Sequence, residues 1–192
     1  MANFYSPLPE VIRYNGKQYR LSTSFDNVLT MYDAVNGMDG AAQVEIMLHY
    51  LVDGKHEISE GLLKGIGLLL FGAQTKKVNK KAYDFTQDSE LIYAAFMQAY
   101  KIDLVNEQGK LHWWKFQALL SGLPSNTRFS EVVNIRTMEV PAPTKCNAEE
   151  RQRIIRLKAD FALKQSAEER EQNLQDGWKK VLSALMQRVK NG

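Results

Sequence analysis

The three histidines are the side chains best suited to bind a metal ion or to transfer a proton. His49 and His56 lie about two helical turns apart, a spacing that would let them share one face of a helix. However, no cysteine accompanies them, and the chain contains neither a His-Glu-x-x-His pattern nor paired cysteines. We therefore predict no metal site. His112 precedes two tryptophans, and we interpret it as a structural residue at the start of a helix rather than a catalytic one.

The residues that could act as nucleophiles or acids also lack catalytic partners. The single cysteine, Cys146, has no histidine near it in the sequence, and a single cysteine excludes an intrachain disulfide. The chain contains no Gly-x-Ser-x-Gly pattern and no phosphate-binding glycine-rich turn followed by Lys-Ser or Lys-Thr. Asp84 and Asp88 lie one turn apart at a predicted helix start, where carboxylates complement the helix dipole. We predict a protein that is not an enzyme and uses no cofactor.

Composition and charge indicate a folded protein without a strong preference for polyanions. Apolar residues make up 44% and charged residues 24% of the 192 residues, which suits one domain or one domain with an appendage. The net charge is +3, and residues 145–192 hold 11 Lys and Arg against 7 Asp and Glu. We interpret this segment as a solvated helical face, with nucleic-acid contact as the alternative. No signal-peptide pattern or membrane-length apolar run is present, so we expect a cytoplasmic protein.

The first third of the chain predicts a β-hairpin followed by three helices. Residues 11–21 alternate like strands around Asn15-Gly16, the dipeptide that favours a two-residue type I′ turn. Apolar spacing predicts helices over residues 25–35, 40–52 and 59–71. The last of these is apolar nearly all round at residues 68–71, which indicates a core or interface position. Gly61 and Gly65, one turn apart, favour close approach of another helix, with a frayed helix as the alternative.

The central stretch, residues 84–136, predicts three short helices that must pack on each other. We expect the first to run from an N-cap at Thr86 to about Tyr100, the second from residues 111–112 to Gly122, and the third from residues 125–127 to Arg136. The adjacent residues Trp113 and Trp114 lie about 100° apart on a helix, so both cannot be equally deep in one core. One should anchor the domain and the other should lie at the surface or in an interface; the sequence leaves the assignment open.

The C-terminal part predicts a connector and two amphipathic helices. Val140 to Thr144 holds two prolines and indicates an extended connector. Asn147 with Glu150 forms a capping-box pattern for a helix to about Lys164, and a further helix is predicted beyond Ser166. Its apolar stripe either docks on the core or binds a partner. The predicted architecture is a mainly α-helical bundle with a small N-terminal β-hairpin and a C-terminal helical appendage, divided into residues 1–139, a connector at 140–146, and residues 147–192.

The pattern around the double tryptophan also resembles a known family. It combines Asp84-Phe85, the run from Leu91 to Phe96, Leu111-His112-Trp113-Trp114-Lys115-Phe116, Gly122-Leu123-Pro124 and Ile135-Arg136, with Leu8-Pro9-Glu10 before the hairpin. Over residues 8–136 the chain resembles the phage and prophage family labelled bacteriophage gene product fifteen. The resemblance implies a product of the tail module of long-tailed phages, encoded between the major tail protein and the tape-measure protein. It brings no catalytic or ligand-binding residues.

That position is typical of tail assembly chaperones, so the leading hypothesis is one that binds the phage tape-measure protein and keeps it soluble in the host cytoplasm. The alternatives are a structural component of the virion or tail tip and, least favoured, a small nucleic-acid-binding regulator. Self-association or pairing with a frameshift-related product is open, and no membrane contact is expected. The candidate partner-binding residues are Trp113, Trp114, Phe116, Leu69, Phe71, Trp178 and Leu182.

Overall fold

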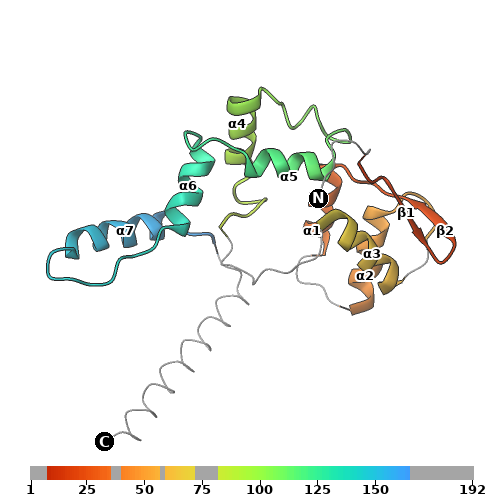
Figure 1. Cartoon of the computed structure of the whole chain (residues 1–192), viewed down its shortest axis with the longest axis horizontal. Coiled ribbons are helices and arrows are strands. Elements are labelled where there is room, and N and C mark those ends of the chain that lie inside the picture. The colour runs from red at the N-terminus through yellow and green to blue at the C-terminus, as the bar shows by residue number, and fades with distance from the viewer. Residues whose placement is uncertain (1–7, 36–39, 57–58, 72–81, 165–192) are drawn as a thin grey trace, which may run out of the picture. The chain divides into compact units, whose positions relative to one another are not determined.

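A computed structural model describes residues 8–35, 40–56, 59–71 and 82–164 of the 192-residue chain. The chain divides into two compact units, Met1–Met138 and Glu139–Gly192, and each is described by itself. The described residues form seven helices and one two-stranded antiparallel sheet (Figure 1). The predicted fold class, mainly helical with a small N-terminal hairpin, is confirmed.

The elements follow one another with short connections. The first unit contains β1 (Val11–Tyr14), β2 (Lys17–Arg20), α1 (Phe25–Ala34), α2 (Gly40–Leu51), α3 (Glu60–Phe71), α4 (Ser89–Tyr100), α5 (Trp113–Ser121) and α6 (Arg128–Thr137). The described part of the second unit contains α7 (Ala148–Asp160). The helices predicted from apolar spacing in the first unit are therefore present, and all but α4 begin close to the expected residue.

The hairpin forms at the predicted turn. Asn15 and Gly16 have φ values of 48° and 72°, the two positive angles that a type I′ turn requires. Tyr14 pairs with Lys17 and Val11 with Arg20, so β1 and β2 are antiparallel and in the expected register. The hairpin is tied to the helices beyond it, because Asp53 donates its backbone N–H to the Arg20 carbonyl at 2.9 Å.

The hairpin packs against α3 through two glycines (Figure 1). A Cβ built on Gly61 would lie 2.4 Å from the Tyr14 hydroxyl oxygen, and one on Gly65 would lie 2.9 Å from the Ile12 side chain. The Tyr14 hydroxyl also bonds to Ser59 Oγ at 3.0 Å, just before α3 begins. The glycines do allow close approach, but the element that approaches is strand β1 and not the predicted helix. Helix α3 is continuous through both glycines and is not frayed there.

An aromatic cluster centred on Phe116 joins α1, α4 and α5. The Phe116 ring stacks on Phe25 at 4.9 Å between centroids, on Phe96 at 5.3 Å and on Trp113 at 5.7 Å. Each of these rings buries a large apolar area, and stacked pairs add about 0.5–1.5 kcal/mol beyond that burial. Two backbone hydrogen bonds bring the starts of α1 and α5 together, from Phe25 to the Leu111 carbonyl and from Trp113 to the Thr23 carbonyl.

Helix α4 begins two residues later than predicted, at Ser89, with Asp88 and not Thr86 as its N-cap residue. Residues 85–88 form turns instead, because the Asp84 carboxylate accepts the backbone N–H groups of Thr86 and Gln87, both at 2.9 Å. Thr86 therefore does not cap the helix. Its hydroxyl donates to the Asp33 carboxylate at 3.0 Å. The interpretation of Asp84 and Asp88 as helix-start acids was right about their place and incomplete about their partners.

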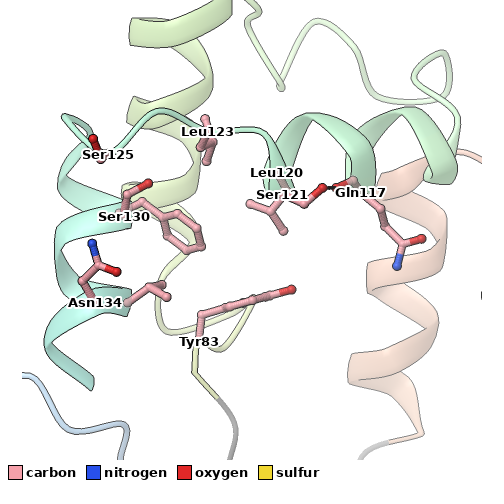
Figure 2. Close-up of a pocket in the computed structure, with 10 residues that line it drawn as sticks. Tyr83, Gln117, Leu120, Ser121, Leu123, Ser125, Ser130 and Asn134 are labelled. Carbon is pink, nitrogen blue, oxygen red and sulfur yellow. Dashed lines mark hydrogen bonds between the residues drawn. The ribbon is translucent and has the colours of Figure 1, made fainter. Parts of the chain in front are cut away.

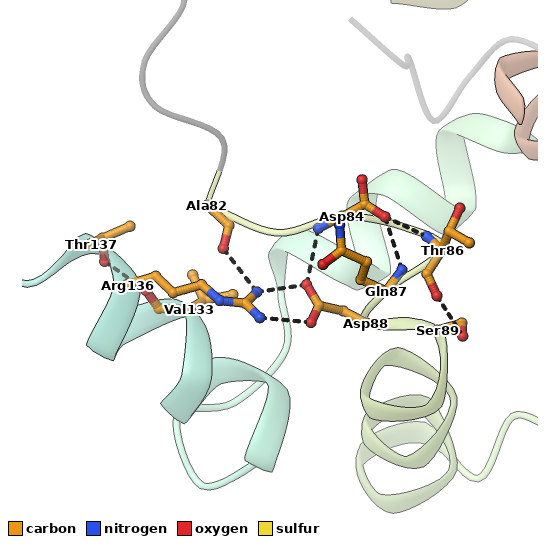
Figure 3. A network of polar contacts seen from close by, with 9 residues as sticks. All are labelled: Ala82, Asp84, Thr86, Gln87, Asp88, Ser89, Val133, Arg136 and Thr137. Carbon is orange, nitrogen blue, oxygen red and sulfur yellow. Dashed lines mark hydrogen bonds and ion pairs between the residues drawn. The ribbon is translucent and has the colours of Figure 1, made fainter. Parts of the chain in front are cut away.

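Asp88 forms a buried ion pair with Arg136 of α6 (Figure 3). The two guanidinium NH2 groups donate to the two carboxylate oxygens at 2.6 and 2.9 Å, and the side chains are only 12% and 3% exposed for Arg136 and Asp88. The Asp88 carboxylate also accepts the Asp84 N–H at 2.9 Å, and Arg136 donates to the Ala82 carbonyl at 3.3 Å. This network fixes the start of α4 against the end of α6.

The described part of the second unit, residues 139–164, consists of the connector and α7. The predicted capping box at Asn147 is wrong in mechanism, because its side chain makes no cap bond to α7. It accepts the Thr144 N–H at 2.9 Å and donates to the Ala142 carbonyl at 2.9 Å instead. Helix α7 ends at Asp160, earlier than the predicted Lys164. The predicted helix beyond Ser166 lies outside the described residues, and the proposed division into residues 1–139, 140–146 and 147–192 stays a prediction.

The glycines of α3 give matched substitutions with opposite expected effects. Gly61→Ala should lower the free energy of unfolding by about 1–3 kcal/mol, because the added methyl group displaces Tyr14 from Ser59. Gly67→Ala, where an added Cβ meets nothing within 4 Å, should raise it by up to about 1 kcal/mol. Urea denaturation followed by circular dichroism measures both. Equal effects of the two substitutions would contradict the packing role of Gly61.

The buried ion pair predicts a strong cost for losing one partner alone. Arg136→Met should lower the free energy of unfolding by about 3–5 kcal/mol, because Asp88 is left charged and buried. Arg128→Met, which removes an exposed pair with Glu131, should cost at most about 1 kcal/mol. The double variant Asp88→Leu with Arg136→Met should be more stable than Arg136→Met. If the stability losses of the single variants Asp88→Leu and Arg136→Met simply added in the double variant, the coupling between these two side chains would be refuted.

Candidate functional site

One hollow in the first unit lies between α5 and α6, with residues drawn in Figure 2. Its volume is about 580 Å³. Its polar lining consists of hydroxyl and amide groups, among them Gln117, Ser121 and Asn134. Among the described residues of the lining, Tyr83 contributes the only titratable side chain, and burial raises the pKa of its phenol. With no carboxylate, imidazole or amine in its lining, this hollow offers no acid–base pair at neutral pH.

The second hollow is an apolar groove of about 370 Å³ that lies over the aromatic cluster. Phe25, Phe116 and Ile92 are buried residues that form its floor. The other residues that line it are Leu29, Phe85, Ser89, Glu90, Tyr93, Leu104, Val105 and Gln108. Val105 and Tyr93 are 62% and 36% exposed, which makes them the accessible apolar side chains of the groove. We define these eleven residues as the α1–α4 groove.

The segment after α4 holds Val105 in this exposed position. Lys101 ends α4 in the left-handed conformation, with φ of 58°. Asp103 accepts the Val105 N–H at 3.0 Å, and the Asp26 carboxylate of α1 accepts the Gly109 N–H at 2.9 Å. The segment is thus anchored on both sides of Val105. An apolar side chain held outward by its own backbone contacts is typical of a preformed binding surface.

The two adjacent tryptophans have different environments. Trp113 is 1% exposed and belongs to the aromatic cluster. Trp114 is half-buried, and its indole N–H donates to the Leu70 carbonyl at 2.8 Å, near the end of α3. Trp113 therefore anchors the domain, and Trp114 joins α5 to α3. This resolves the assignment that the sequence left open.

His112 caps α5 as a neutral imidazole. Its Nδ1 accepts the Trp114 N–H at 3.0 Å, so Nε2 bears the proton and donates to the Pro9 carbonyl at 3.4 Å. Burial lowers the pKa of His112, an effect that the Pro9 carbonyl and the Glu10 charge oppose and the Lys115 charge reinforces. With both ring nitrogens engaged, His112 has the structural role that we interpreted from the sequence.

The described residues show neither a metal centre nor a membrane span. No group of three His, Cys, Asp or Glu side chains among them lies close enough together to hold a metal ion. None of the described helices is both long and apolar enough to cross a membrane. The α1–α4 groove combines an aromatic floor with exposed apolar side chains, which makes it a candidate surface for a partner.

Comparison with known protein families identifies the family of the chain. A family model described as Bacteriophage Gp15 protein matches residues 4–163. The chain belongs to the Bacteriophage Gp15 protein family. This is a family of phage structural or assembly proteins. No curated protein and no solved structure matched the chain.

The family match in this Gp15 protein is longer than the resemblance suggested. We expected it to cover residues 8–136, with a looser fit beyond, whereas the match continues to residue 163. It therefore includes the connector and all of α7. The second unit of this Gp15 protein is in part a family feature and not only an appendage of this sequence.

The candidate partner-binding residues of this Gp15 protein lie in different places. Trp113 and Phe116 are each 1% exposed; Trp113 lies inside the core, whereas Phe116 also lines the floor of the α1–α4 groove. Trp114 and Leu69 are half-buried. The Phe71 side chain, Trp178 and Leu182 are outside the described residues. Whether any of the candidates contacts a partner stays a prediction.

Sequence reasoning missed Val105 and Tyr93 as surface residues. Tyr93 falls on the predicted helix to Tyr100 but off its apolar positions, which was a usable signal of exposure. Val105 lies between two predicted helices, in Asp-Leu-Val-Asn, where no periodicity applies. Its exposure depends on the Asp103 and Asp26 contacts, and these are tertiary features.

The His112 cap predicts a stability that falls in mild acid. The lowered pKa means that the unfolded chain binds a proton more readily than the folded chain, so His112 stabilises the fold fully above pH 6.5. That contribution should be lost as the pH falls through the lower, folded-state pKa. His112→Asn keeps an acceptor for the Trp114 N–H but does not titrate, so it should flatten the pH dependence of the unfolding midpoint.

The matched control is His49→Asn, since His49 is exposed on α2. It should leave the pH dependence of the unfolding midpoint close to that of the unmodified protein. Thermal unfolding at a series of pH values between neutral and mildly acidic measures all three proteins. An unchanged slope in His112→Asn would show that the imidazole is not the titrating group.

Proposed function

We propose that this Gp15 protein is a phage tail assembly chaperone that binds the tape-measure protein and keeps it soluble in the host cytoplasm during tail assembly. The observation that supports this most directly is the open α1–α4 groove, whose floor is the aromatic core and whose accessible side chains are apolar. Membership of a phage structural or assembly family supports the same class of role.

The mechanism requires binding and no chemical step. A tape-measure protein is long and helical in this hypothesis, and each of its amphipathic segments exposes an apolar stripe until the tail tube forms round it. The groove would cover one such stripe in the manner of helix-in-groove recognition. The lining contains a single carboxylate, Glu90, and the phenol of Tyr93, which is consistent with a non-enzymatic role.

The size of the groove favours reversible binding. Complete burial of a Leu or Phe side chain contributes about 1.5–3 kcal/mol, so two or three such anchors contribute roughly 4–8 kcal/mol before the cost of association. After the cost of association is subtracted, the net affinity for each segment is weak. Weak affinity suits a chaperone, because the tail-tube subunits must displace the chaperone from the tape-measure protein. Many copies along one long partner would give protection without tight binding at any one segment.

The test is co-expression with the tape-measure protein from the same phage. The unmodified protein should raise the soluble fraction of the tape-measure protein and copurify with it. Val105→Asp places a charge in the apolar groove and should reduce both effects several-fold, while its unfolding midpoint stays nearly unchanged because Val105 is 62% exposed. The matched control is Ile155→Asp, at an exposed apolar position on α7, which should behave as the unmodified protein.

Two results would contradict the proposal. One is a tape-measure protein that is equally soluble without this Gp15 protein. The other is the recovery of this protein in stoichiometric amount in purified phage particles by mass spectrometry, which would support the alternative of a structural component of the virion or tail tip.

A further inference from the structure

Acidic side chains surround the apolar α1–α4 groove. The segments that line it are α1, residues 84–93, residues 103–110 and, through Phe116, α5. Asp88 lies among them, but Arg136 balances its charge. The other charged residues of these segments are six acids, Asp26, Asp33, Asp84, Glu90, Asp103 and Glu107, and two bases, Lys110 and Lys115.

Three of these acids lie at the border of the groove, two of them placed there by hydrogen bonds. Asp26 accepts the Gly109 N–H at 2.9 Å, next to the lining residue Gln108. Asp33 accepts the Thr86 hydroxyl at 3.0 Å, next to the lining residue Phe85. Glu90 lines the groove directly from α4 and is exposed. The acids therefore lie on both the α1 and the α4 sides, where flanking charges of a bound helix would be.

No Lys or Arg side chain among the described residues lines the groove. Of the two bases in the bordering segments, Lys110 donates its ammonium group to the Asn106 carbonyl at 2.8 Å, and Lys115 is exposed on α5 without lining the groove. The local charge at the border is thus strongly negative, although residues 1–144 of the chain are close to neutral, with 14 basic and 15 acidic residues. A charge this uneven selects partners by the sign of their charge.

We infer that the α1–α4 groove binds one amphipathic helix whose apolar stripe is flanked by Lys and Arg. This rests on the proposed chaperone function and specifies which segments of the tape-measure protein bind here. The apolar stripe covers Val105, Tyr93 and the aromatic floor, and the basic flanks lie beside Glu90, Asp26 and Asp33. Helices with acidic flanks are repelled by the same border, so the groove selects among amphipathic segments that are equally apolar.

The closing experiment uses two labelled peptides of about 18 residues, roughly five helical turns. Both have the same leucine stripe, and they differ only in having Lys or Glu at the flanking positions. Fluorescence anisotropy with the full chain measures the dissociation constant of each. At low ionic strength the Lys-flanked peptide should bind at least about tenfold more tightly, and added salt should reduce the ratio because exposed charges are screened.

Two variants test the place of binding. Glu90→Lys should weaken the Lys-flanked peptide several-fold and strengthen the Glu-flanked one. Val105→Asp should weaken both peptides, because the apolar contact is common to them. The charge control is Glu45→Lys, an exposed position on α2 that does not line the groove, and it should leave both affinities within about twofold.

Equal binding of the two peptides, or loss of selectivity in Glu45→Lys but not in Glu90→Lys, would overturn the inference.

A third labelled peptide, residues 177–192 of this chain, tests a different occupant. Its sequence combines Trp178 and Leu182 with Lys179, Lys180, Arg188 and Lys190. If this peptide bound the groove more tightly than the Lys-flanked peptide, a second copy of this chain would replace the tape-measure helix as the occupant.

The experiments distinguish a failure of the groove inference from a failure of the proposed chaperone function. If the tape-measure protein stays soluble with Val105→Asp and Glu90→Lys as well as with the unmodified protein, the chaperone function stands and the groove is the wrong surface. If the Lys-flanked peptide binds selectively but the tape-measure protein gains no solubility, the groove is a basic-helix site and the chaperone function is wrong.

Discussion

The stacking of Phe116 between Phe25 and Phe96 is the interaction on which the first unit depends. These rings come from α5, α1 and α4, three helices of 9–12 residues that are too short to be stable in isolation. Phe25 and Phe116 are also part of the floor of the groove. The same aromatic surface therefore stabilises the fold on one side and offers apolar contact on the other, so the groove exists whenever the domain is folded.

The ion pair between Asp88 and Arg136 adds a second constraint, on the entry into α4. The bidentate geometry places the turn of residues 84–88 against α6, and Phe85 in that turn lines the groove. The buried pair adds little net stability over an apolar pair but fixes one arrangement of the two elements. Glu90, two residues further along the chain and in the lining of the groove, has no such ion pair among the described residues. Charge is therefore balanced inside the unit and unbalanced at the groove.

Local signals in the sequence predicted most of the fold. The Asn15-Gly16 dipeptide is sufficient to predict the hairpin turn, and His112 and Gly122 are sufficient to predict the two ends of α5. Both features therefore depend on residues that are close in the sequence. The start of α4 was missed because Asp88 pairs with a residue 48 positions away, which removes it from local capping. For the same reason Gly61 and Gly65 predicted a close approach but not which element approaches. Propensity and spacing describe one segment, and the partner of that segment is tertiary information.

The surface was harder to predict than the fold, because large aromatic residues suit a core and an interface equally well. Trp113 and Phe116 were candidates for partner contact and are both core residues, whereas the exposed Val105 has no distinguishing feature in sequence. Its exposure follows from the anchoring of residues 103–109 by two aspartates. A side chain presented by anchored backbone loses little conformational entropy on binding, so even a small apolar contact gives useful affinity. Such a surface suits the proposed role, in which it binds one helix of a long partner and later releases that helix.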